Sequence, residues 1–184
     1  MTDVLRGDVA EALVDYRGAA GGSFEMSQSF PLVFKFEDVV AGDGFVARVL
    51  AFGRALLVQE EDGDFFVYGV TPGAVAGGGR ERSEALSAFK KAYLTVLFDL
   101  AAETSGAVAF EEQVRGFFYE SCDDLNDAWQ EARERVLAGE IDLDVLERVP
   151  ADLFPPQVTL IVSAPPTAQA NPQHEDTYFL PRAA

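Results

Sequence analysis

Hydrophobic and polar positions alternate along much of residues 32–70, which is the pattern of strands with one buried face. Two turn sequences interrupt the alternation, at residues 41–44 and at the Asp62-Gly63 pair, and an Asp-Gly pair favours a tight hairpin turn. Four segments carry the strand pattern: residues 32–36, 45–50, 55–59 and 65–70, and residues 51–53 lead from the second segment into the third. We therefore predict an antiparallel sheet of four strands in meander order, with one face to be covered.

The period changes to three and four residues from Arg82 to Glu103. A wide apolar stripe recurs there: Ala85, Phe89, Ala92, Tyr93, Val96, Leu97 and Leu100. This stripe predicts one long helix that covers the sheet. Gly77, Gly78 and Gly79 precede the helix without the Lys-Ser/Thr of a phosphate loop or the spacing of a dinucleotide site. We interpret them as positions that need positive φ angles or a close approach of strand and helix.

Further elements follow the long helix. Residues 110–118 fit one helical face, although the alternation at Val108 and Phe110 also allows a strand at the start. A longer helix should begin near Ser121 or Asp123 and end at Gly139, with a short helix at 141–149 and a late edge strand at Gln157–Ser163. Trp129 is more typical of a core anchor than of a ligand platform. The predicted fold class is α+β: an antiparallel meander sheet backed by one long helix, with additional helices and a late edge strand.

Changes in composition divide the chain into three parts. Residues 1–22 predict an N-terminal helix and a flexible joint of small residues, and residues 23–163 a single α+β domain. Residues 164–184 are rich in proline and polar residues and predict a mobile C-terminal tail. Within this tail, residues 178–180 are apolar enough to dock on the domain or on a neighbour.

Residues 54–100 also carry a family resemblance. A hairpin ending in Pro72-Gly73, then three glycines at 77–79, then residues 83–86 opening a helix resemble the order found in HicB-like proteins, the antitoxin side of a small bacterial toxin-antitoxin system. The resemblance implies a HicB-like core, a partly open sheet backed by one helix. It also implies that a homodimer is one expected state and that a small basic ribonuclease toxin is one class of partner. The C-terminal part shows no helix-turn-helix or ribbon-helix-helix pattern for DNA binding.

The charge balance narrows the choice of partners. The chain has 14 basic and 31 acidic residues and a net charge of −17, so it should repel nucleic acid and attract a basic protein such as a toxin or nuclease. Solubility alone is the competing explanation for this charge. The predicted hairpin turn concentrates candidate partner-binding residues: Glu60, Glu61, Asp62 and Asp64.

Signals for catalysis are missing from the sequence. Cys122 and His174 are the single residues of their types, so neither a disulfide within the chain nor a cysteine-histidine metal cluster is expected, and no nucleophile signature or cofactor motif occurs. We assign no catalytic, cofactor-binding or metal-binding residue and favour a non-enzymatic binding protein. The alternative is a small-molecule binder or enzyme with a pocket between the sheet and the C-terminal helices, lined by four aromatic residues: Phe110, Phe117, Tyr119 and Trp129.

The sequence also bears on location. No apolar run approaches the roughly 20 residues that span a bilayer, and residues 1–3 do not begin a signal peptide. We therefore expect a cytoplasmic protein without a membrane partner.

Overall fold

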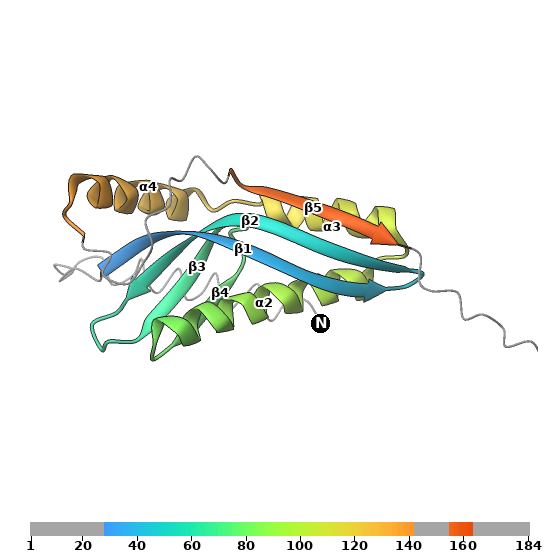
Figure 1. Ribbon diagram of the computed structural model, residues 1–184, viewed down its shortest axis with the longest axis horizontal. Coiled ribbons are helices and arrows are strands. Elements are labelled where there is room, and N and C mark those ends of the chain that lie inside the picture. The colour runs from blue at the N-terminus through green and yellow to red at the C-terminus, as the bar shows by residue number, and fades with distance from the viewer. Residues whose placement is uncertain (1–27, 142–154, 164–184) are drawn as a thin grey trace, which may run out of the picture.

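A curled antiparallel sheet and three helices form the part of the chain that this computed structural model describes, residues 28–141 and 155–163 (Figure 1). The elements in chain order are β1 (Gln28–Gly42), β2 (Phe45–Gln59), β3 (Phe65–Thr71), β4 (Ala76–Gly79), α2 (Arg82–Glu103), α3 (Ala107–Tyr119), α4 (Asp123–Ala138) and β5 (Gln157–Ser163). The predicted α+β class is confirmed. The predicted N-terminal helix and joint (1–22), all but Ile141 of the short helix at 141–149, and the tail at 164–184 lie outside the described residues.

Strand β2 organises the sheet. One of its edges pairs with β1 along its whole length, and the other edge is shared: residues 46–52 pair with β5 and residues 54–59 with β3. The segments predicted as a second and a third strand, 45–50 and 55–59, are therefore one continuous strand. Gly53 lies within this strand and pairs with Phe34 of β1, and a Cβ at this position would lie 2.3 Å from Thr71 O and 2.5 Å from the Phe34 ring. Gly53 permits close packing between neighbouring strands rather than a turn.

The three glycines before the long helix belong to a fourth strand. Strand β4 pairs with β3, and Gly77 lies opposite Val67. None of the three has a positive φ. A Cβ on Gly77 would lie 2.2 Å from Phe89 N on α2, and one on Gly79 would lie 2.5 Å from Glu84 Cβ. Of the two interpretations of these glycines, the close approach of strand and helix is the one the structure shows.

Helix α2 has the predicted bounds and covers one face of the sheet (Figure 1). Its buried residues follow four-residue steps: Ala85, Phe89, Tyr93, Leu97 and Ala101. Edge-to-face ring contacts join it to β1, with centroids 5.1 Å apart for Phe34 and Phe89 and 4.5 Å apart for Phe36 and Tyr93. Helix α3 extends this core with Phe110, Val114 and Phe118, so the segment that also allowed a strand is helical.

Helix α4 lies on the opposite face of the sheet (Figure 1). Leu56 and Val58 of β2 pack against Trp129 and Ala132 of α4, whereas Leu57, between them in the strand, belongs to the core under α2. Trp129 is 2% exposed and its Nε1 donates to Leu32 O at 3.1 Å. Trp129 is therefore a core anchor, as predicted. Helix α4 ends at Gly139, which has a left-handed φ of 77°.

Candidate functional site

The turn between β2 and β3 holds the four acidic candidates together. Glu60 N donates to Asp64 O at 2.9 Å, and Gly63 N donates to Glu60 O at 3.0 Å. Asp62 Oδ1 accepts a hydrogen bond from Asp64 N at 3.1 Å, and Gly63 has a φ of +90°. These bonds fix the turn at the end of a hairpin, so its carboxylates are presented from an ordered backbone rather than from a loose loop.

The carboxylates of this turn repel one another. Partial burial raises the pKa of Glu60, and the charges of Asp62 and then Asp64 raise it further. Among the residues that the structure describes, no lysine or arginine forms an ion pair with Glu60, Glu61, Asp62 or Asp64. The turn is therefore a concentration of negative charge that the described fold does not neutralise.

The four aromatic candidates for a pocket fall into different surroundings. Phe110 is fully buried, with its ring 4.9 Å from that of Phe45, and Phe117 stacks on Tyr93 at 5.9 Å. Tyr119, at the end of α3, is 52% exposed. Trp129 packs on the other face of the sheet, in a separate cluster. The structure brings Phe110 and Phe117 into one core and separates Trp129 from them by the thickness of the sheet.

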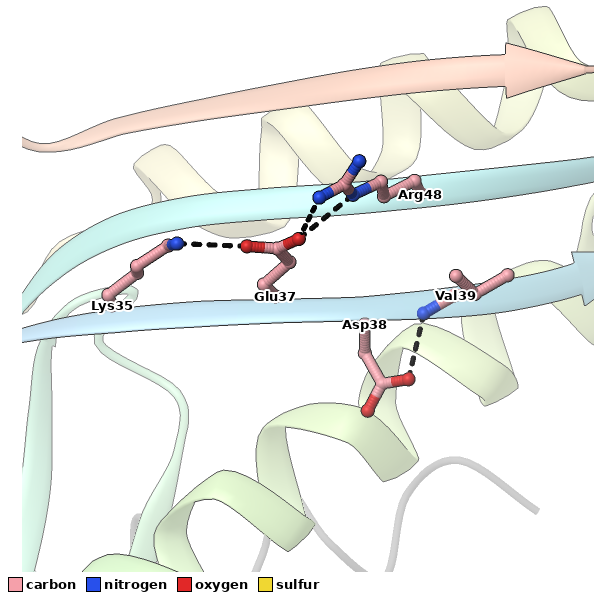
Figure 2. A network of polar contacts seen from close by, with 5 residues as sticks. All are labelled: Lys35, Glu37, Asp38, Val39 and Arg48. Carbon is pink, nitrogen blue, oxygen red and sulfur yellow. Dashed lines mark hydrogen bonds and ion pairs between the residues drawn. The ribbon is translucent and has the colours of Figure 1, made fainter.

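A groove between β1 and α2 is a feature that our sequence interpretation missed. Its volume is about 340 Å³. The lining residues are Lys35, Phe36, Glu37, Asp38, Lys90, Lys91 and Leu94. Lys35, Lys90 and Lys91 are all the lysines of the chain, and all three line this groove, although the Lys35 ammonium group is directed to Glu37 and away from α2 (Figure 2). The adjacent Lys90-Lys91 pair on the predicted helix was the available signal, but nothing local connects it to Lys35.

Beside this groove, Glu37 is held between two cations (Figure 2). Lys35 Nζ lies 2.9 Å from Glu37 Oε2, and Arg48, on β2, donates to Glu37 Oε1 through Nε at 2.9 Å and through Nη2. Hydrogen bonds from Lys35 and then Arg48, together with their charges, lower the pKa of Glu37 to about 2. Figure 2 also shows Asp38 turned away from this network, with Oδ1 accepting from Val39 N at 2.8 Å.

The described residues contain no group of three or more histidine, cysteine, aspartate or glutamate side chains that could hold a metal ion. Cys122, just before α4, is a partly buried free thiol. Within residues 28–141 and 155–163, no helix has the length and apolar character needed to cross a membrane. No protein-family model, curated protein or solved structure matches the chain.

Proposed function

We propose that this chain is a non-enzymatic binding protein of HicB-like build that engages a small basic protein through its acidic β2–β3 turn. A toxin or nuclease is the class of partner that the resemblance at residues 54–100 implies. The proposal concerns protein binding alone. A chain with a net charge of −17 should repel the phosphate backbone of a nucleic acid, so direct binding of DNA or RNA forms no part of it.

The observation that supports the proposal most directly is the unneutralised turn. Its four carboxylates lie within five positions, on a backbone fixed by hydrogen bonds, and repulsion among them contributes to the raised pKa of Glu60. A cationic partner would offset the repulsion among these four carboxylates. Relief of the repulsion present in the free protein would therefore add to the free energy of binding. The overall negative field would also speed the encounter with such a partner.

Solubility is the competing explanation, and it predicts a different distribution of effects. If the acidic residues serve only to keep the protein soluble, four charges removed from the turn should matter no more than four removed elsewhere. Helices α3 and α4 provide a matched set of exposed acidic residues: Glu112, Asp127, Glu131 and Glu134.

The experiment is a purification of the tagged full chain from its native host at low salt. We expect a stoichiometric basic protein that high salt releases. The variant Glu60→Gln, Glu61→Gln, Asp62→Asn and Asp64→Asn should bind the purified partner at least about tenfold more weakly, which corresponds to about 1.4 kcal/mol. Asparagine at position 62 keeps an oxygen that can accept from Asp64 N.

The control variant Glu112→Gln, Asp127→Asn, Glu131→Gln and Glu134→Gln changes the net charge by the same four units. It should keep most of the affinity. Equal losses in both variants would assign the effect to overall charge and contradict a role for the turn. Recovery of no basic partner at all would contradict the proposed function itself.

A further inference from the structure

We propose that the groove between the outer edge of β1 and helix α2 binds an extended acidic peptide, which adds to β1 as a further strand. This site is separate from the acidic turn and has the opposite charge preference. Gln28, at the start of β1, pairs with Gln59, the residue before the acidic turn. Lys35 lies seven positions further along β1, so the groove is roughly 23 Å from the turn along the strand.

The first support is the outer edge of β1. In the described sheet, β1 pairs with β2 on one side only. Alternate residues of an edge strand direct their main-chain groups outward. Val39 N donates to Oδ1 of the adjacent residue Asp38, which indicates that the main-chain groups of odd-numbered residues point away from β2 here. Lys35 and Glu37 then present N–H and C=O groups to the groove, and these are the groups with which an added strand pairs.

The second support is the position of α2 beside this edge. Lys90, Lys91 and Leu94 line one side of the groove, and residues 35–38 of β1 line the other. A groove bounded by a strand edge and a helix can hold a peptide whose main chain bonds to the strand while its side chains contact the helix. Leu94 adds an apolar surface between the charged positions.

The third support is charge. Lys90 and Lys91 have no ion-pair partner among the described residues. Glu37 is already neutralised by Lys35 and Arg48, so among the lining residues Asp38, whose Oδ1 accepts from Val39 N, is the carboxylate that offsets part of the charge of Lys90 and Lys91. The groove therefore keeps a positive balance within a chain of net charge −17. Acidic side chains of an added strand complement Lys90 and Lys91, whereas a basic peptide does not.

A second copy of this chain is a less suitable occupant. Antiparallel pairing of two β1 edges around residue 36 would place Lys35 opposite Glu37 of the other copy, but it would also bring Lys90 and Lys91 of both copies to one shared groove, where their like charges repel. A separate acidic segment avoids this repulsion. We therefore assign the groove to an acidic peptide partner, and the oligomeric state becomes one readout of the test.

The test uses the full chain labelled with ¹⁵N and a capped six-residue peptide of alternating glutamate and valine as the probe. We expect amide shifts at Lys35, Glu37, Lys90 and Lys91, and slower hydrogen exchange at the Lys35 and Glu37 amides. A capped peptide of alternating lysine and valine should cause neither change. Equal shifts with both peptides, or no shift at millimolar peptide, would overturn the proposal.

Two further readouts separate the other occupants. If sodium phosphate reproduces the shifts and the glutamate peptide gives no exchange protection, the groove is a simple anion site and strand addition is wrong. Suppose instead that the protein without peptide is a dimer in which the Lys35 and Glu37 amides are already protected from hydrogen exchange. If the peptide does not dissociate this dimer, a second copy occupies the outer edge of β1 and the proposal is likewise wrong.

A pair of charge-reversed variants tests the role of the lysines. Lys90→Glu with Lys91→Glu should weaken binding of the glutamate peptide about tenfold or more, since two charge pairs are lost and the reversed charges add repulsion. Arg115→Glu with Arg133→Glu makes the same change in net charge on α3 and α4 and should alter affinity less than about twofold. Equal weakening by both variants would contradict the groove. Lys90→Gln with Lys91→Gln provides a milder version, which exposed helix positions tolerate.

Discussion

Tyr93 places a hydroxyl group in the aromatic core between α2 and β1. The side chain is fully buried, its ring contacts those of Phe34, Phe36 and Phe117, and its hydroxyl has no hydrogen-bond partner in the described part of the chain. Burial also raises the pKa of Tyr93. A buried hydroxyl without a partner costs about 1–3 kcal/mol, and phenylalanine has the same shape without that group.

We therefore expect Tyr93→Phe to raise the free energy of unfolding by about 1 kcal/mol. Urea denaturation measures this change. The matched variant Tyr119→Phe, at a position that is 52% exposed, should leave stability within about 0.5 kcal/mol of the parent. A loss of stability in Tyr93→Phe would show that the hydroxyl makes a stabilising contact in solution.

Glu37 gives a prediction for pH. Its pKa is lowered from 4.5 to about 2 by Lys35 and Arg48, so the folded state holds the charged form more strongly than the unfolded state does. The stabilising contribution is present above pH 4.5 and is lost as the pH falls through about 2. Glu37→Gln should therefore be less stable than the parent at neutral pH, and the difference should disappear across this range.

Urea midpoints of the parent and of Glu37→Gln, compared as a function of pH, measure this difference. NMR titration of the Glu37 carboxyl is the direct check, and Arg48→Gln should raise its midpoint toward 4.5. If Arg48→Gln leaves the titration midpoint of Glu37 unchanged, the ion pair between Glu37 and Arg48 does not persist in solution.

At the scale of elements, Gly77 sets how closely β4 approaches α2. A Cβ there would lie 2.2 Å from Phe89 N and 2.7 Å from Ala88 C, and both are main-chain atoms of the helix. The clash cannot be relieved by turning a side chain, so Gly77→Ala must shift the strand or the helix. We expect a loss of about 1–3 kcal/mol in the free energy of unfolding.

Gly116 provides the control for this prediction. It lies within α3, and a Cβ there would meet nothing within 4 Å. Gly116→Ala should stabilise the protein by roughly 0.5–1 kcal/mol, because alanine loses less backbone freedom on entering a helix. Thermal unfolding of the two variants should therefore shift in opposite directions. A Gly77→Ala variant as stable as the parent would contradict the close contact between β4 and α2.

The same elements show how far local patterns predict the fold. The bounds of α2 followed from its own periodicity, and the acidic turn followed from consecutive residues. The local pattern did not predict that residues 45–50 and 55–59 form one strand. In the sequence Gly53 looks like a strand end, and only the positions of Phe34 and Thr71 beside it show why glycine is needed there. The lysine groove and the side of the sheet that Trp129 occupies depend on how distant elements pack, which local spacing does not specify.

At the scale of the whole molecule, a net charge of −17 destabilises the folded state through self-repulsion. Raising the ionic strength from about 0.01 M to about 0.1 M shortens the screening length from about 30 Å to about 10 Å. Salt weakens two opposing effects, the general repulsion and the surface ion pairs, such as Arg115 with Glu111. Exposed pairs of this kind contribute at most about 1 kcal/mol each, so relief of the repulsion should dominate.

We therefore expect the Tm to rise with sodium chloride over this range, by about 2–4 °C if the gain is about 1 kcal/mol. Scanning calorimetry of the full chain at constant pH measures it. The variant with a neutralised β2–β3 turn should start from a higher Tm and gain less from salt, because part of the repulsion has been removed at its densest point. A Tm that falls with salt would mean that ion pairs outweigh repulsion. Repulsion among the carboxylates of the β2–β3 turn would then be too weak to favour binding of a basic partner.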